Sequence, residues 1–154
     1  MNPITTHRLD ELYRDAYLLG TIVADQNRLE LDQVCHKFHI SIAQYPVLWT
    51  LCLSDSDDGV PMSEVADGLV TRAADATRLV DRLVEGGFVT RQQSVEDRRK
   101  VLVRATSKGR KVFESVTAEI KDVHHEQFAS LSYDEVKTLI NLLNKLVWRA
   151  EGQA

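Results

Sequence analysis

The chain has 154 residues, of which 44% are hydrophobic and 27% are charged, and its formal net charge at pH 7 is −4. This length suits one domain with one core, and the proportions are those of a globular protein. Because no apolar run approaches the ~20 residues of a membrane-spanning helix and no signal-peptide pattern opens the chain, we expect a cytoplasmic protein that does not enter a membrane.

The charges are unevenly distributed along the chain. Residues 71–112 hold eleven Lys and Arg against five Asp and Glu, a net charge of +6, whereas the remaining residues hold 8 against 18, a net charge of −10. An acidic body with one basic lobe is repelled by nucleic acid everywhere except at that lobe, and its binding should weaken steeply with salt. The overall acidity therefore does not exclude DNA binding.

The first half of the chain reads as three helices. Apolar residues recur every three or four positions from Leu9 to about Val34, which predicts a long amphipathic helix. Ser41 and Gln44 have capping-box spacing for a second helix to about Ser54, although Pro46 could shift its start. A polar, turn-forming stretch then leads to a short helix over MSEVADGL.

A fourth helix is predicted from Thr71 to Glu85, where Gly86 and Gly87 end it. One stripe at helical spacing is expected to face the core, and it comprises Ala76, Leu79, Val80, Leu83 and Val84. The opposite face is small at its start and cationic further on, which suits a DNA major groove; it includes Thr71, Ala74, Asp75, Arg78 and Arg82. We expect Arg72 to contact DNA as well. The alternative for the arginines is ion pairing along the helix.

A β-hairpin follows, with strands near Phe88–Arg91 and Val101–Ala105 and the sequence EDRRK at its tip. Asp97 can pair with a nearby Arg and stiffen the loop, which leaves the other guanidinium groups of Arg98 and Arg99 free to reach phosphates or a minor groove. Lys100 is the third cation of this run. Taken alone, this charge run would be read as a solvated tip. The preceding helices favour DNA contact instead.

Two further helices complete the pattern. Thr106 or Ser107 can cap a long helix, and Ser132 with Glu135 forms a capping box for the last one. The predicted fold is mostly α with a small β-hairpin wing: a winged helix-turn-helix lobe over about 41–106, and helical dimerisation segments over about 8–35 and 107–150. Because the terminal helices carry more apolar surface than a small lobe can cover, we expect a homodimer.

The stretch LVTRAADATRLVDRLVEGGFVTRQQSVEDRRKVLVRATSKG resembles the central block of the MarR family of bacterial transcription regulators. The likeness is carried by the helix over 77–83, by Gly87-Phe88-Val89, by Asp97-x-Arg99 and by Thr106-x-x-Gly109. Looser similarity extends over AQYPVLWTL before the block and LSYDEVKTLINLLNKL after it. The chain departs at Ala74-Asp75-Ala76, where such regulators often carry hydroxyl groups, so the bases that it reads stay open.

The resemblance implies a winged-helix homodimer that binds pseudo-palindromic promoter DNA and usually represses. Arg99 matches the wing-tip arginine that enters the minor groove, Asp97 matches its orienting carboxylate, and residues 71–78 match the base-reading part of the recognition helix. Many relatives bind a small aromatic acid or phenol in a cleft. Residues that fall in segments able to line such a cleft are Tyr17, His36, His39, Tyr45 and Trp49.

Other functions have weaker support. Cys35 and the histidines invite a redox-responsive or metal-responsive regulator, but no HxxxH pair or CxxC motif occurs. The aromatic residues at helical spacing could equally belong to the core. A winged-helix protein-interaction module without DNA affinity is the rival class. No catalytic constellation, phosphate loop or cofactor motif is present, so we expect neither an enzyme nor a cofactor or metal site.

Overall fold

The structure, a computed structural model, describes residues 3–54, 56, 58–69 and 73–147, with side chains described from Arg8 onward and not at positions 73 and 74. The chain divides into two compact units, residues 1–120 and residues 121–154. Thr71 and Arg72 lie outside the described residues.

The first unit begins with the long helix α1 (Pro3–Lys37), which extends beyond both predicted ends. Its C-terminal end is anchored, because Val34 and Cys35 are buried. Further toward the N-terminus the apolar side chains are largely exposed, among them Leu12 at 62% and Tyr17 at 73%. The described residues of this unit therefore leave most of the apolar face of α1 uncovered.

Helix α2 (Tyr45–Leu53) starts later than Ser41 because a turn precedes it. The Ser41 backbone N–H donates to Gln44 Oε1 at 2.8 Å, so half of the predicted capping box forms within this turn. Pro46 falls in the first turn of the helix, where a missing N–H costs no intrahelical hydrogen bond. Pro46 is therefore compatible with a helix that starts at Tyr45.

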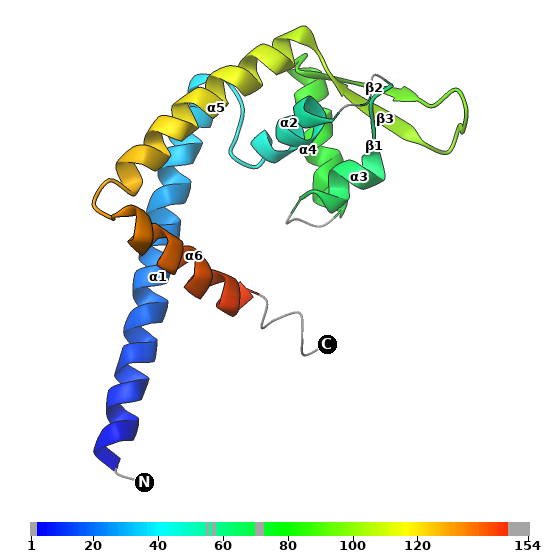
Figure 1. Cartoon of the computed structure of the whole chain (residues 1–154). Helices are drawn as coiled ribbons and strands as arrows, with labels where there is room; N and C mark the ends of the chain where they lie inside the picture. Colours follow the sequence, from blue (N-terminus) through cyan, green and yellow to red (C-terminus); the bar gives the residue numbers. More distant parts are fainter. Residues whose placement is uncertain (1–2, 55, 57, 70–72, 148–154) are drawn as a thin grey trace. The chain divides into compact units, whose positions relative to one another are not determined.

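A small antiparallel sheet lies beside the short helices. Its strands are β1 (Val60–Pro61), β2 (Val89–Gln93) and β3 (Val101–Ala105), in the order β1-β3-β2. Strand β1 was not predicted; it has two residues, and its proline is tolerated because it lies at the sheet edge. Helices α3 (Met62–Asp67) and α4 (Ala73–Glu85) lie between β1 and β2 in the chain, and the β2–β3 hairpin extends past them (Figure 1).

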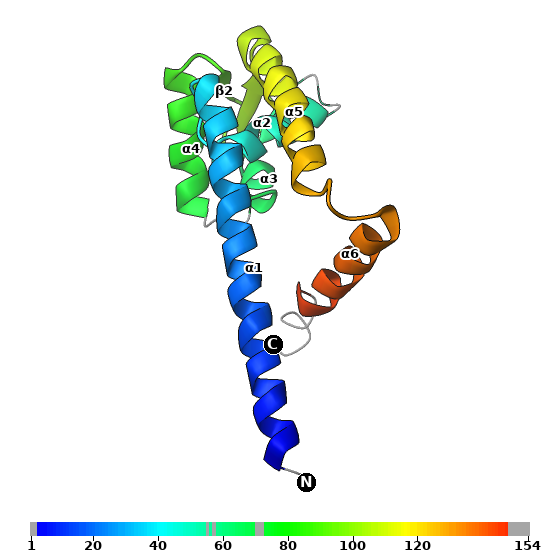
Figure 2. The same cartoon turned by 90° about the vertical axis from the view of Figure 1, so that its left-hand side faces the viewer.

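The core of the first unit lies where these helices meet the sheet. Both views show α2, α3 and α4 gathered near the C-terminal end of α1 (Figures 1 and 2). The completely or almost completely buried side chains come from every element around this point, and they include Cys35, Val47, Leu48, Val65, Ala76, Val80, Leu83, Val103 and Val116. The prediction of a mostly helical winged helix-turn-helix fold with a hairpin wing is confirmed.

Helix α5 (Ser107–Gln127) begins as predicted, because the Thr106 hydroxyl accepts a hydrogen bond from the Gly109 N–H at 3.0 Å. Two polar contacts join its first part to other helices of this unit. Lys37 Nζ lies 2.6 Å from Glu119 Oε2, and the hydroxyls of Tyr45 and Thr117 are 2.9 Å apart.

The second unit holds the end of α5 and helix α6 (Tyr133–Val147). The predicted capping box is confirmed: the Ser132 N–H donates to Glu135 Oε2 at 2.8 Å, and the bonds from Ser132 lower the pKa of Glu135. Within the described part of α6 no side chain is buried, and Ile140 and Leu143 are 51% and 50% exposed. No helix among the described residues is long and apolar enough to cross a membrane.

Candidate nucleic-acid interface

Helix α4 is held on the lobe by its apolar side. Ala76, Val80 and Leu83 are fully buried, as predicted, while Leu79 is only partly buried. The prediction for Val84 is wrong, because its side chain is 39% exposed. The buried stripe is therefore narrower than the apolar stripe in the sequence, and it leaves the rest of α4 available to a ligand.

The C-terminal end of α4 is closed by a Schellman motif. Phe88 N–H donates to the Leu83 carbonyl and Gly87 N–H donates to the Val84 carbonyl, both at 2.9 Å. Gly87 takes the left-handed conformation that this motif requires, with φ of 72°. The sharp end turns the chain directly into β2, so the hairpin starts at a defined point relative to α4.

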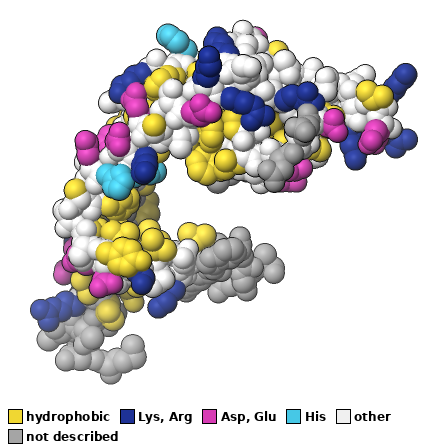
Figure 3. Space-filling view, turned by 45° about the horizontal axis from the view of Figure 1, so that its top comes forward, with side chains coloured by type: hydrophobic (Ala, Val, Ile, Leu, Met, Phe, Trp, Pro, Cys, Tyr) yellow, Lys and Arg dark blue, Asp and Glu magenta, His cyan; other side chains and the backbone are white. Residues whose placement is uncertain are grey.

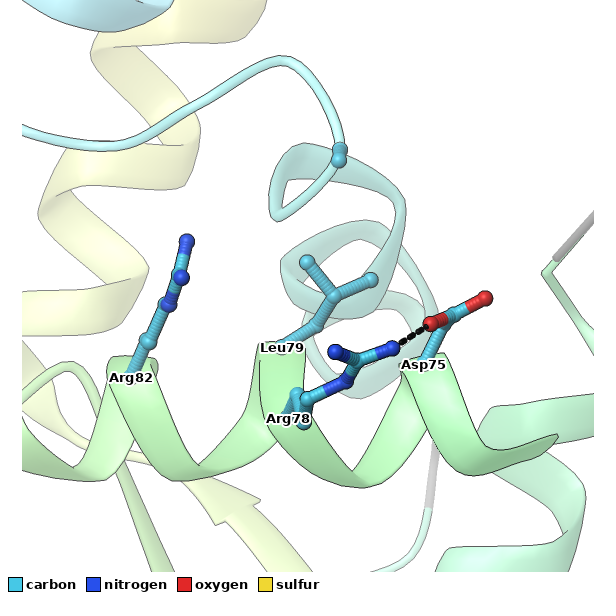
Figure 4. Close-up of a pocket in the computed structure, with 5 residues that line it drawn as sticks. Asp75, Arg78, Leu79 and Arg82 are labelled. Carbon is cyan, nitrogen blue, oxygen red and sulfur yellow. Dashed lines mark hydrogen bonds and ion pairs between the residues drawn. The ribbon is translucent and has the colours of Figure 1, made fainter. Parts of the chain in front are cut away.

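An exposed groove of about 350 Å³ runs along the polar side of α4, and it is lined by Ala43, Asp75, Arg78, Leu79 and Arg82. Figure 4 shows Asp75, Arg78, Leu79 and Arg82 on the same side of the helix. Arg78 forms an ion pair with Asp75, so the ion-pairing alternative is realised for this arginine. Its side chain is nevertheless 76% exposed, and an exposed pair of this kind is weak enough to open for a stronger anion.

Arg82 is the second cation of this face, and no ion pair involves it among the described residues. For Ala74 only the backbone is described, as part of the first turn of α4. The predicted contacts at Thr71 and Arg72 fall outside the described residues. The structure therefore brings together Asp75, Arg78 and Arg82 from the predicted base-reading set.

The wing loop between β2 and β3 is ordered by hydrogen bonds among its own residues. Ser94 N–H donates to the Lys100 carbonyl and Lys100 N–H donates to the Asp97 carbonyl, both at 2.9 Å. The Asp97 carboxylate accepts from the Arg99 backbone N–H at 3.0 Å. Such a side-chain-to-backbone turn pre-orders the loop before any ligand arrives.

The prediction that Asp97 pairs with a guanidinium group needs correction. Within the described wing, its carboxylate holds the backbone of Arg99 and not a side chain. Asp and Asn readily bond to an N–H two residues on, and at a tight loop this local bond competes well with a flexible arginine. The consequence expected from the sequence is retained, because the loop is stiffened and the guanidinium groups stay available.

Arg98, Arg99 and Lys100 are all exposed at this loop. Figure 3 shows Lys and Arg side chains projecting from the end of the hairpin, beside acidic ones. Exposed, unpaired guanidinium groups on an ordered loop can bind phosphate oxygens bidentately or enter a narrow minor groove. The lobe thus presents two cationic groups, one on α4 and one on the wing.

The five residues suggested for an effector cleft are not gathered in one place. Tyr45 and Trp49 pack with Phe113, with ring centroids 5.8–6.0 Å apart in all three pairs. Burial raises the pKa of Tyr45, whereas Trp49 is 46% exposed. Tyr17 lies on the exposed face of α1, away from this aromatic cluster in the chain and with 73% of its surface exposed.

The two histidines of this set have local roles at the end of α1. His36 Nε2 lies 3.3 Å from the Asp32 carboxylate one turn earlier. His39 has φ of 61° and follows the helix end, where His39 N–H and Ile40 N–H donate to the carbonyls of His36 and Cys35. His39 therefore terminates α1 in a left-handed conformation that more often belongs to glycine.

Several contacts of the lobe are not predictable from the sequence. Arg91 on β2 forms an ion pair with Asp81 on α4, and Phe113 and Thr117 on α5 complete the contacts of Tyr45. None of these has a local signal, because the partners are 10 to 72 residues apart. In the described part of the chain, no three His, Cys, Asp or Glu residues form a group that could hold a metal ion.

The chain is similar in sequence and in structure to known proteins. The MarR family model matches residues 40–101. The multiple antibiotic resistance protein MarR of Escherichia coli K12 is 30% identical over 141 residues, which cover 89% of this chain and 96% of that protein. The crystal structure of a mutant E. coli MarR complexed with operator DNA aligns with a TM-score of 0.76 at 29% identity, covering 89% of this chain and 96% of that one.

A more distant likeness concerns the fold alone. AbsC, a MarR family transcriptional regulator from Streptomyces coelicolor, aligns with a TM-score of 0.80 at 19% identity, covering 91% of this chain and 95% of AbsC. The prediction that the chain is not an enzyme is confirmed, since matched relatives are named as transcriptional regulators. The MarR family model matches residues 40–101, and the chain is 30% identical to E. coli MarR across most of both chains. This protein therefore belongs to the MarR family of transcription regulators.

Proposed function

We propose that this chain is a sequence-specific DNA-binding repressor that binds a pseudo-palindromic promoter site as a homodimer. One observation carries the proposal: a chain with a net charge of −4 presents exposed cations on α4 and on the wing of a single winged helix-turn-helix lobe. The solved complex of a mutant E. coli MarR with operator DNA, whose chain has the same fold, supports it.

The two cationic groups have different tasks in this proposal. Base reading in the major groove is assigned to Asp75, Arg78 and Arg82 on α4, together with Thr71, Arg72 and Ala74. Asp75 accepts from a cytosine amino group or caps the helix start, and Arg78 exchanges Asp75 for DNA. The wing cations Arg98, Arg99 and Lys100 bind phosphates and the adjacent minor groove, where a narrow width attracts arginine.

Dimerisation is assigned to the terminal helices, over about 8–35 and 107–150, with the lobe over about 41–106. Support comes from the exposed apolar side chains of α1 in the first unit and of α6 in the second unit. A face of this size is seldom left in water by a soluble protein. A two-fold dimer also matches a two-fold DNA site, because each lobe then meets an equivalent half-site.

A small aromatic or phenolic effector is the proposed signal for release. The aromatic cluster of Tyr45, Trp49 and Phe113 offers ring surfaces and one hydroxyl, and it is a more compact candidate than the wider set with Tyr17, His36 and His39. An effector bound there would act by changing the separation of the two α4 helices in the dimer. Burial raises the pKa of Cys35 to about 11, which disfavours the thiolate that redox sensing needs.

The test is the salt dependence of DNA binding by the full chain. We expect binding to random duplex DNA to weaken steeply as salt rises, because a few released counterions already give a log–log slope of several units. A duplex selected from a random pool should bind tighter than random duplex at each salt concentration. A slope near zero together with no selected sequence would favour the rival function, a winged-helix module that binds protein.

A further inference from the structure

An ion pair joins the base-reading helix to the wing. Arg91 on β2 donates from Nη1 to the Asp81 carboxylate on α4, across ten positions of the chain. The Arg91 side chain is 31% exposed and that of Asp81 is 49% exposed. The pair is therefore partly shielded from water, which makes it stronger than a freely exposed surface pair.

Arg91 lies at the point where the hairpin leaves the core. Only Val89 is buried along β2, and the next four residues are exposed. Arg91 pairs in register with Val103 of β3, and beyond it the hairpin continues to Gln93 paired with Val101. Among the described residues, the Arg91–Asp81 pair is the one side-chain hydrogen bond or ion pair that joins the β2–β3 hairpin to α4.

The hairpin beyond Arg91 is held together by its own hydrogen bonds. The hydrogen bonds of Ser94, Asp97 and Lys100 close the loop, and the strand ladder continues up to it. Four residues of strand span ~13 Å, so a rotation of about 10° at Arg91 would displace the wing tip by roughly 2 Å. Such a shift breaks hydrogen bonds, because the donor–acceptor distance of a protein hydrogen bond varies over only about 0.5 Å.

We infer that Asp81 and Arg91 are positioning residues which set the angle between α4 and the wing, and thereby the spacing between the major-groove and minor-groove contacts. Neither residue needs to touch DNA for this role. The inference rests on the proposed function, since it assigns what holds the two DNA-contacting groups in register.

The sign of the charge makes this inference testable. Replacing Asp81 by Asn removes a negative charge from a DNA-binding lobe, so simple electrostatics predicts tighter binding to any duplex. The positioning role predicts weaker binding to the selected duplex instead. A matched control is Glu85→Gln on the same helix, which removes the same charge from an exposed side chain for which no ion pair exists among the described residues.

The experiment measures the affinity of the full-length wild type and of D81N, R91Q, E85Q and the charge swap D81R/R91D for the selected duplex and for random duplex. Thermal unfolding of each protein verifies that it is folded. We expect D81N and R91Q each to lose about tenfold in affinity for the selected duplex. E85Q should bind that duplex at least as tightly as the wild type, and the swap should recover to within about threefold of it.

Two results would overturn the inference. D81N binding the selected duplex as tightly as E85Q would show that the pair does not position the wing. A swap variant that stays as weak as R91Q would show that Arg91 acts by touching DNA directly. Failure of the proposed function is separate, because the wild type itself would then show no selected sequence and no salt dependence.

Discussion

Gly109 lies directly against the backbone of Phe88: a Cβ placed on Gly109 would come 2.0 Å from the Phe88 carbonyl oxygen. Thr106 binds the same chain segment. Its backbone N–H donates to the Phe88 carbonyl at 3.0 Å, and its hydroxyl donates to the Gly87 carbonyl at 2.8 Å. The start of α5 is thus seated on the chain segment that ends α4, and only a residue without a side chain permits this approach.

We therefore expect Gly109→Ala to destabilise the protein by roughly 1–3 kcal/mol, because the first turn of α5 must move away from Phe88. Urea unfolding would measure the change. The control is Gly20→Ala in α1, where a Cβ would meet nothing within 4 Å. That variant should gain roughly 0.5–1 kcal/mol from helix propensity. A Gly109→Ala protein as stable as the wild type would contradict the close seating.

Cys35 should make stability fall at high pH. Burial, followed by the nearby Asp32 carboxylate, raises the pKa of its thiol from 9.0 to about 11. Between these values the unfolded chain releases the thiol proton while the folded chain keeps it, so the free energy of unfolding decreases as pH rises. The contribution is fully present below pH 9, and about 1 kcal/mol of it is lost by pH 10.

The measurement is urea unfolding of the wild type and of Cys35→Ala at pH 8, 9 and 10. Every other titratable group is common to both proteins, so the comparison isolates Cys35. The stability of the wild type should fall more steeply than that of the variant. Parallel pH dependences would show that the thiol ionises as easily in the folded chain as in the unfolded one.

The local features of the fold could be read from the sequence because their causes are local. Caps at Thr106 and Ser132, the glycine end of α4 and the alternation in β3 each depend on residues within a few positions. Contacts between distant segments carry no such signal. The pairing of Arg91 with Asp81, and the hydroxyl contact of Tyr45 with Thr117, arise only when the elements pack.

Some features of the candidate site could likewise be predicted from the sequence, and others could not. Which side of α4 stays exposed was predictable from periodicity, yet the exposure of Val84 was not, because the width of the buried stripe depends on what packs against it. The wing cations were identified from the pattern Asp97-x-Arg99. The partner of Asp97 was not, since a carboxylate beside several donors can choose a backbone N–H over a guanidinium group.

Replacing Arg99 by Ala should weaken binding to the selected duplex by about 1–3 kcal/mol, because the variant lacks the guanidinium group proposed to enter the minor groove. Discrimination should relax at the base pairs under the wing and not elsewhere. Arg8→Ala is the matched control, since it removes the same charge from an exposed position on α1. Equal affinities of the two variants would remove Arg99 from the interface.

Asp97 should tolerate Asn but not Ala. An Asn side chain keeps an oxygen that can accept from the Arg99 N–H, whereas Ala leaves the loop without this bond. We expect Asp97→Ala to weaken binding to the selected duplex by about 1 kcal/mol, and Asp97→Asn to bind at least as tightly as the wild type because it also removes a negative charge. Fluorescence anisotropy with labelled duplex measures both. Equal losses in the two variants would instead assign Asp97 a role that requires its charge.

A charge on the apolar face of α6 should separate the proposed dimer. Ile140 is 51% exposed in the single chain, yet it shares a face with Leu143 and Val147. If that face lies in the dimer interface, Ile140→Glu buries an unpaired carboxylate and shifts the protein to monomers, which sedimentation velocity would detect. Asn141→Glu places the same charge on the opposite side of the helix and should stay dimeric.

Because a paired site needs two linked lobes, the Ile140→Glu protein should also lose most of its preference for the two-fold duplex while still binding a half-site weakly. A dimeric Ile140→Glu protein with full affinity would exclude this face of α6 from the interface.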